Sequence, residues 1–131
     1  MRIIADTNVL VRSVVRDDAD QALVADATLR DASLIVVTVA CLCEFAWVLR
    51  KTYGFARSDI SAAIRALHAA GNVEMNRPAV EAGLSLLDAG GDFADGAIYH
   101  EGEWLGGEMF VSFDRKAVTL LKAQGRAAQL L

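Results

Sequence analysis

Short apolar runs rich in β-branched residues alternate with longer, helix-like segments along the whole chain. We expect strands at Ile3–Ala5, Leu34–Val37, Val73–Met75, Met109–Val111 and Ala127–Leu130, because each run is too short for a helix and most are rich in strand-forming residues. Strands that alternate with helices usually pair in parallel through right-handed crossovers. The alternation therefore predicts an α/β fold with a parallel sheet, but it does not give the strand order.

Cap residues and helix breakers set the bounds of seven predicted helices between these strands. Thr38, for example, is suited to cap a helix that Gly54 ends. The predicted helices are Asn8–Val15, Gln21–Arg30, Val39–Tyr53, a fourth from Ser58 or Asp59 to before Gly71, a fifth from Asn76 to about Asp88, a sixth from Asp92 to near Gly106, and Ala117–Ala123. No repeat, low-complexity tract or linker interrupts them, so we expect one domain over residues 1–131.

Composition excludes several classes of protein. An apolar fraction of 54% excludes a disordered chain. No apolar run approaches the roughly 20 residues of a membrane span, and Asp6 interrupts the N-terminal apolar residues too early for a secretory signal. We therefore expect a cytoplasmic protein that does not bind membranes. The net charge of −4 argues against a broad basic surface for nucleic acid, although an acidic metal site would itself contribute negative charge.

The two cysteines, Cys41 and Cys43, do not form a typical disulfide or metal motif. Two residues apart on a helix, they point in different directions and cannot easily bridge. A Cys-x-Cys pair with no nearby histidine is not a zinc site. We interpret both as reduced core residues.

Four acidic residues stand out by their positions. Asp6 follows the first strand, Glu44 lies in the second turn of the helix after the second strand, Asp95 lies in the first turn of the sixth helix, and Asp114 follows the fourth strand. In open parallel sheets, ligands bind outside the carboxyl ends of the strands, so we expect these four side chains to converge there. Helix capping is a simpler explanation for Asp6 and Asp114, and Asp92 is suited to cap the helix in which Asp95 would favour the dipole.

Glu44 has no such simple explanation. It lies too far inside its helix to cap it, and its neighbours are apolar, so we expect it to be buried. A buried carboxylate needs a partner, either a distant arginine or a cation shared with Asp6 and Asp95. Carboxylates and water favour hard cations such as Mg²⁺ or Mn²⁺, which activate water and stabilise charge on a phosphoryl group. The residues alone thus indicate a metal-dependent phosphodiesterase or phosphatase.

Four ordered motifs resemble those of the PIN-domain ribonucleases, in particular the VapC-type toxins of bacterial toxin–antitoxin pairs. They are Asp6-Thr7-Asn8, Glu44 in an apolar helix, Asp92-Phe-Ala-Asp-Gly-Ala-Ile98, and Ser112-Phe-Asp-Arg-Lys116. The resemblance covers essentially the whole chain. It implies a three-layer fold with a central parallel sheet of order 3-2-1-4-5 flanked by helices. It also implies hydrolysis of RNA phosphodiester bonds by water that Mg²⁺ or Mn²⁺ activates.

The resemblance also assigns roles to individual residues. Asp6, Glu44 and Asp95 take the three core acidic positions, Asp114 takes the more variable fourth, and Asp92 is the alternative to Asp95. Supporting polar roles fall to Asn8 and Ser112. Gly96 departs from the pattern, which often has alanine after the third acid, so we expect a looser start to that helix.

The implied partners are RNA, a small cognate antitoxin whose tail occupies the active-site groove, and a second copy of the chain. Trp47, Tyr53, Phe55 and Ile60 are candidates for an exposed apolar face, with ordinary core as the equal alternative. Six basic residues are candidates for holding RNA phosphates: Arg12, Arg16, Arg50, Lys51, Arg115 and Lys116.

Two other classes of protein share this strand–helix alternation. A receiver-type signalling domain needs an aspartate at the end of the third strand and a lysine at the end of the fifth, and residues 73–76 and 129–131 supply neither. A haloacid-dehalogenase-type phosphatase needs a second aspartate two residues after the first, where this chain has Asn8. A metal-dependent phosphatase or a receiver-like domain remains the alternative function.

Overall fold

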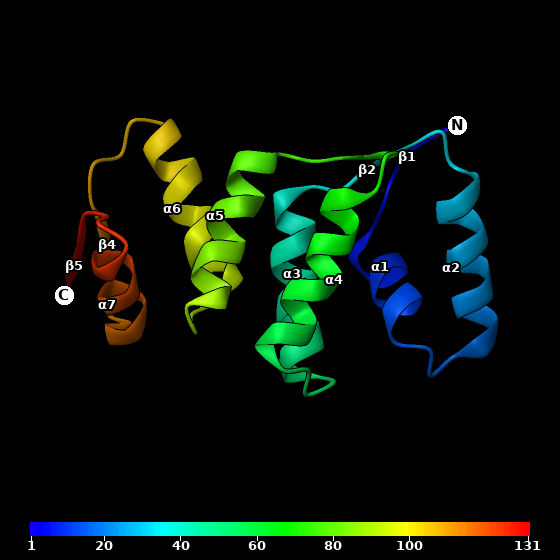
Figure 1. Cartoon of the computed structure of the whole chain (residues 1–131), viewed down its shortest axis with the longest axis horizontal. Coiled ribbons are helices and arrows are strands. Elements are labelled where there is room, and N and C mark those ends of the chain that lie inside the picture. Colours follow the sequence, from blue (N-terminus) through cyan, green and yellow to red (C-terminus); the bar gives the residue numbers. More distant parts are fainter. The chain divides into compact units, whose positions relative to one another are not determined.

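Five short strands and seven helices alternate along the chain, as the sequence pattern predicts (Figure 1). The computed structural model describes residues 1–131 as two units, Met1–Asn76 and Arg77–Leu131. The first contains β1 (Arg2–Ile4), α1 (Thr7–Val14), α2 (Ala19–Asp31), β2 (Leu34–Val36), α3 (Val39–Lys51), α4 (Arg57–Ala69) and β3 (Val73–Glu74). The second contains α5 (Arg77–Asp88), α6 (Phe93–Trp104), β4 (Phe110–Ser112), α7 (Arg115–Ala123) and β5 (Ala128–Leu130). None of these helices has both the length and the apolar character needed to cross a membrane.

All strand pairs are parallel, but the strands form two sheets. In the first unit β2 is central, with Ile35 opposite Ile3 of β1 and Val73 of β3. In the second unit β4 pairs with β5, and Val111 lies opposite Gln129. The structure therefore confirms an α/β fold with parallel pairing and does not show the five-stranded sheet of order 3-2-1-4-5. The observed orders β1-β2-β3 and β4-β5 match the segments 3-2-1 and 4-5 of that predicted order.

Local sequence signals fix the helix ends of the first unit. The Thr38 hydroxyl accepts a hydrogen bond from Cys41 N at 3.1 Å and caps α3, and Gly54 follows that helix with φ of 68°. Leu42, Phe45 and Leu49 of α3 are among the largest fully buried side chains, and α3 packs on α1 and α4. The first unit is thus built around one face of α3.

Close contact between α5 and α6 organises the second unit. Gly96 on α6 is buried against the α5 backbone, where a Cβ would meet the Ala82 carbonyl and lie 2.9 Å from Gly83 Cα. The prediction of a looser helix start at Gly96 is therefore wrong, because the missing side chain lets the two helices approach. Beside this pair, Leu86 of α5 packs in a core cluster with Val118 and Leu121 of α7.

Gly96→Ala is expected to destabilise the protein by about 1–3 kcal/mol, because the added Cβ meets backbone atoms that cannot move aside cheaply. Gly102, also in α6, has open space around the position of a Cβ. Gly102→Ala is therefore the matched control, with a gain of up to about 1 kcal/mol from helix propensity. Urea unfolding of both variants measures the difference, and equal effects would contradict the close packing of α5 and α6.

Candidate functional site

Asp6 and Glu44 lie near the same buried thiol in the first unit. The Asp6 carboxylate accepts a hydrogen bond from Thr7 N at 2.8 Å and caps α1. The buried Thr7 hydroxyl donates to Cys41 Sγ at 3.6 Å, which ties the start of α1 to the first turn of α3. Burial raises the pKa of the Cys41 thiol, and the charges of Asp6 and Glu44 add to the rise while the Thr7 hydrogen bond opposes it. Both carboxylates are therefore close enough to Cys41 to act on it.

The prediction that Glu44 is buried is wrong. Glu44 is exposed, because α3 turns Leu42, Phe45 and Leu49 inward and leaves Glu44 and Trp47 on the solvent side. The apolar run around Glu44 includes Trp47, which is exposed, so an apolar sequence did not mean a helix buried all round. An exposed carboxylate needs no compensating partner, so burial no longer supports the assignment of Glu44 to a metal. The structure also shows no salt bridge to Glu44.

Three aspartates gather in the second unit. Carboxylate oxygens of Asp92, Asp95 and Asp114 all lie within 4.8 Å of one another. Asp92 is the N-cap residue of α6, yet its side chain makes no capping hydrogen bond. Asp114 caps α7 by accepting from Ala117 N at 3.1 Å, and its own backbone N–H donates to the Ser112 hydroxyl at 2.9 Å. The helix starts of α6 and α7, the latter directly after β4, therefore hold the cluster, and Ser112 steadies its Asp114 side.

Asp95 is the least exposed member of this acidic cluster. Burial raises the pKa of its carboxyl group, and the charges of Asp92 and Asp114 raise it further, in that order. No salt bridge to a lysine or arginine relieves the three carboxylates. Closely spaced carboxylate oxygens are the ligands that Mg²⁺ and Mn²⁺ prefer, so this donor set fits such an ion. A divalent ion would also reduce the repulsion among the three charges.

Asp95→Asn is expected to stabilise the metal-free protein at pH 7. The pKa of Asp95 is raised in the folded protein. Its contribution to the free energy of unfolding is therefore most favourable below its unfolded-state pKa and is lost as the pH rises through its folded-state pKa. Removing the charge should add roughly 0.5–1 kcal/mol to the free energy of unfolding in EDTA, as for other partly exposed charges. This gain should disappear below about pH 4, where the carboxyl is protonated in both states.

Asp59→Asn is the matched control for this measurement. Asp59 also lies in the first turn of a helix, α4, but belongs to no acidic cluster. Its loss should remove only a favourable dipole interaction, of roughly 0.3–1 kcal/mol. Urea unfolding at two pH values compares the variants, and a destabilised Asp95→Asn protein would contradict repulsion within the cluster.

The six basic candidates for RNA phosphates divide into two groups. Arg12 is ion-paired with Asp17 at 2.7 Å, and Arg16 with Asp26 at 2.8 Å. The Tyr53 hydroxyl and the Asp17 charge raise the pKa of the Arg12 guanidinium despite its partial desolvation. The other four candidates make no ion pair: Arg50, Lys51, Arg115 and Lys116. The second group is better placed to hold phosphates.

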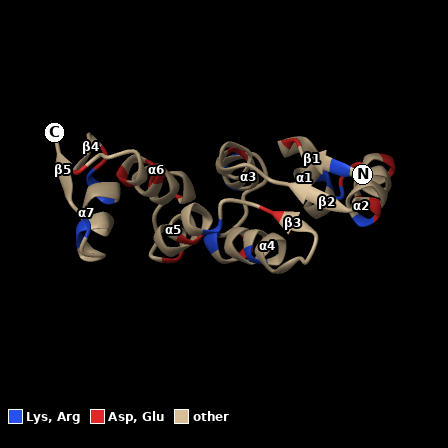
Figure 2. Cartoon of the chain, turned by 90° about the horizontal axis from the view of Figure 1, so that it is seen from above, with Lys and Arg blue, Asp and Glu red and all other residues tan.

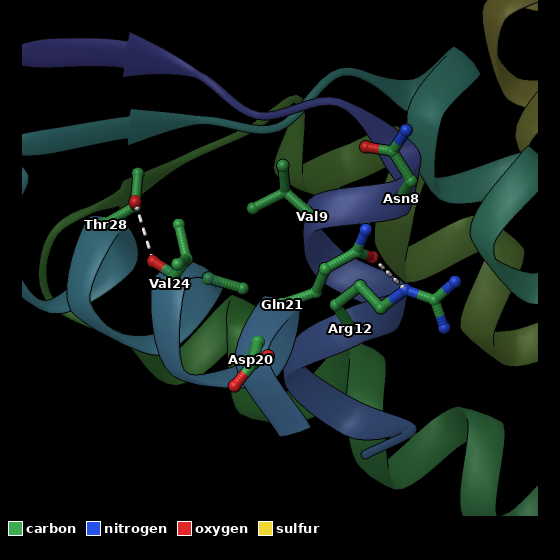
Figure 3. A pocket seen from close by; sticks show the side chains of 8 residues that line it. Asn8, Val9, Arg12, Asp20, Gln21, Val24 and Thr28 are labelled. Atoms are coloured by element: carbon green, nitrogen blue, oxygen red, sulfur yellow. Dashed lines mark hydrogen bonds between the residues drawn. The ribbon is translucent and has the colours of Figure 1, made fainter. Parts of the chain in front are cut away.

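A pocket of about 560 Å³ lies between α1 and α2 (Figure 3). Figure 3 shows Arg12 reaching across it to the Gln21 side chain, whose Oε1 accepts from Arg12 Nε at 2.7 Å. Val9 and Val24 supply apolar walls, and Asn8 lies at the pocket beside the Asp6 turn. The residues that line it are Asn8, Val9, Arg12, Asp20, Gln21, Val24, Ala25 and Thr28. Asp6 itself does not line this pocket.

Sequence reasoning found every acid of the two groups, but it did not find what holds them. The Thr7–Cys41 contact was missed because Thr7 and Cys41 lie 34 positions apart. The structure puts Asp92 and Asp95 in one cluster instead of choosing between them. Acidic residues occur in both units (Figure 2). Comparison of the chain with protein-family models, with curated proteins and with solved structures finds no match.

Proposed function

We propose that the chain is a Mg²⁺- or Mn²⁺-dependent endoribonuclease that hydrolyses RNA phosphodiester bonds. The observation that carries the proposal is the cluster of Asp92, Asp95 and Asp114, whose carboxylate oxygens lie within 4.8 Å of one another. Burial, and then the charges of Asp92 and Asp114, raise the pKa of Asp95 within it. A cluster of carboxylates alone does not distinguish between different phosphate substrates. The assignment of RNA as the substrate rests on the ordered motifs that resemble those of PIN-domain ribonucleases.

Each residue has a definite role in this proposal. Asp92, Asp95 and Asp114 would hold the ion, and Asp6 and Glu44 are the further acidic residues that the resemblance implies. When bound, such an ion activates water and stabilises the charge of the phosphoryl group. The chain itself keeps the carboxylates in position, through the hydrogen bonds of Asp114 with Ser112 and Ala117 and the contact of Thr7 with Cys41. Asn8, exposed in the first turn of α1, would take the supporting polar role that the resemblance implies.

We also propose that the strands form a single sheet of order 3-2-1-4-5, with β1 and β4 as neighbours. β1 is an edge strand of its own sheet, and Ile4 on it is 79% exposed. Val111 of β4 is 55% exposed. Exposed apolar residues on unpaired edges invite pairing, and this order would bring the strand ends before Asp6 and Asp114 to one edge. Slow amide hydrogen exchange in β1 and β4, as in β2, would support the order, and fast exchange in both would contradict it.

The proposed biological role is that of the toxin in a cytoplasmic toxin–antitoxin pair, acting as a homodimer. The cognate antitoxin would be small, and its tail would occupy the active-site groove. The pocket beside Asn8 offers a place for an apolar segment of a partner, because it has apolar walls and both charges, Arg12 and Asp20; none of the proposed metal-binding acids lines it. Purification with the product of the neighbouring gene tests the pairing, and a complex that cleaves RNA as fast as the free chain would contradict inhibition. Light scattering measures the dimer.

The test of the activity combines cleavage with thermal unfolding. An ion that binds only the folded state, at ten times its dissociation constant, should raise the melting temperature by about 3–6 °C. Single-stranded RNA should be cleaved with Mg²⁺ or Mn²⁺ and not in EDTA. Asp95→Asn should lose both responses, at an ionic strength matched with NaCl. The absence of any thermal shift would count against the metal site, and hydrolysis of phosphomonoesters without RNA cleavage would favour the phosphatase alternative.

A further inference from the structure

The charges of the second unit are divided between two parts of its sequence. Residues 78–114 contain no lysine or arginine, and every charged residue among them is an aspartate or a glutamate. Residues 115–131 show the reverse, because they contain lysines and arginines and no acidic residue. Figure 2 shows this division, with acidic residues on α6 and basic residues on α7. The second part is therefore where this unit can attract a polyanion.

The basic residues of α7 lie on its exposed side. The other side of the helix is buried in the unit by Ala117, Val118 and Leu121. Helical spacing places residues 115, 116, 119 and 122 opposite these three, and all four are exposed. Thr119 adds no charge, and its hydroxyl donates to the Arg115 carbonyl at 2.8 Å. The exposed cations are Arg115, Lys116 and Lys122, and we call them the α7 basic face.

No salt bridge occupies the α7 basic face, although Asp114 directly precedes Arg115. The remaining cation of this part of the chain is already engaged, because Arg126 Cζ lies 4.8 Å from the centre of the Tyr99 ring. In the first unit, by contrast, three arginines pair with aspartates: Arg12, Arg16 and Arg30. The cations of the α7 basic face are therefore available to a ligand from outside the chain.

The α7 basic face begins at the acidic cluster. Asp114 is both a member of the cluster and the N-cap of α7. At 1.5 Å per residue, Lys122 lies about 12 Å beyond Asp114 along the helix. An ion held by the cluster would act on one phosphate only, so the neighbouring phosphates of a nucleic acid strand need other cations. In the second unit, α7 supplies such cations on an exposed surface.

We propose that the α7 basic face binds the phosphates of RNA on one side of the cleaved bond, with the strand running along α7 from the acidic cluster towards Lys122. The inference rests on the proposed nuclease function and deepens it by assigning a binding surface and a direction to the substrate. Contacts with phosphates position a nucleic acid without reading its bases. The α7 basic face therefore strengthens binding to all RNA sequences equally.

Lys122→Gln tests the proposal best, because Lys122 is the cation furthest from the acidic cluster. Binding of a labelled RNA oligonucleotide in EDTA, measured by fluorescence anisotropy, should weaken about 2- to 5-fold. The slope of log affinity against log salt concentration should fall by about 0.7, as for one lost phosphate contact with a single strand. With Mg²⁺, KM should rise while the single-turnover rate at saturating RNA stays the same. Arg115→Gln and Lys116→Gln, added to Lys122→Gln, should each weaken binding further.

Arg30→Gln is the matched control. Arg30 is exposed in the last turn of α2, as Lys122 is in the last turn of α7, so both substitutions remove one cation from the same helix position. Arg30→Gln should bind RNA with the affinity and the salt dependence of the wild type. Urea unfolding checks that both variants are folded. The effect of Lys122→Gln should be the same on two RNA oligonucleotides of unrelated sequence.

The possible failures of the α7 basic face and of the nuclease function are distinguishable. If Lys122→Gln binds RNA as tightly as the wild type while the wild type cleaves it with Mg²⁺, the α7 basic face is wrong and the nuclease function stands. Equal losses in Arg30→Gln and Lys122→Gln, or a loss confined to one RNA sequence, would also overturn it. If the wild type neither binds nor cleaves RNA, both proposals fail. Binding that Lys122→Gln weakens, without any cleavage by the wild type, would support the α7 basic face and contradict the nuclease function.

Discussion

Asp95→Asn is expected to reduce metal-dependent RNA cleavage by about 100- to 1,000-fold while the protein remains folded. Asp95 is the least exposed of the three clustered aspartates, and both other charges act on it. Asparagine keeps the shape of the side chain but removes the charge that attracts the ion. A loss of about 3–4 kcal/mol of transition-state stabilisation corresponds to this change in rate. Single-turnover cleavage at saturating RNA, with Mg²⁺ varied, measures the rate and the apparent metal affinity together.

Asp92→Asn is the comparison within the cluster. Asp92 is exposed at the start of α6, so we expect a smaller loss, of about tenfold, and a smaller fall in metal affinity. Asp59→Asn, in the first turn of α4, should cleave RNA at the wild-type rate. If Asp92→Asn is the more damaging of the pair, Asp92 and not Asp95 is the third acidic ligand. If neither has any effect, the cluster does not hold the catalytic ion.

Helix and strand positions were predictable because they depend on neighbouring residues. The Thr38 cap and the Gly54 stop bracket α3 in the sequence as in the structure. Strand order depends instead on contacts between distant segments, and alternation of strands and helices is compatible with many orders. Each strand has three residues or fewer, which is too short a pattern to indicate which other strand it pairs with.

The candidate site was predictable in its residue types and not in its environment. The sequence shows that Asp6 and Asp114 follow predicted strands. In the structure both residues are also the N-caps of helices, α1 and α7. The burial of Glu44 was inferred from its apolar neighbours in the sequence. One of those neighbours, Trp47, is itself exposed, so an apolar neighbour did not mean that this side of the helix is buried. Gly96 appeared to weaken α6, because the sequence does not show that the α5 backbone lies against it. In both cases the deciding fact is which neighbour a helix face meets.

Glu44→Gln is expected to separate catalysis from folding more sharply than any other substitution. Because Glu44 is exposed and makes no salt bridge, removing its charge should change the free energy of unfolding by no more than about 0.5 kcal/mol. A buried ion-pair partner would instead cost about 3–5 kcal/mol. If Glu44 is a metal ligand, RNA cleavage should fall about 100- to 1,000-fold, and Asp6→Asn should behave alike.

The matched control for Glu44→Gln is Glu101→Gln, which removes the same charge from an exposed position on α6. Its cleavage rate and its stability in urea with EDTA should both equal those of the wild type. The two measurements must be read together, because a low rate in an unfolded variant says nothing about ligands. A Glu44→Gln protein that is as stable as the wild type and still cleaves RNA at the wild-type rate would remove Glu44 from the metal site.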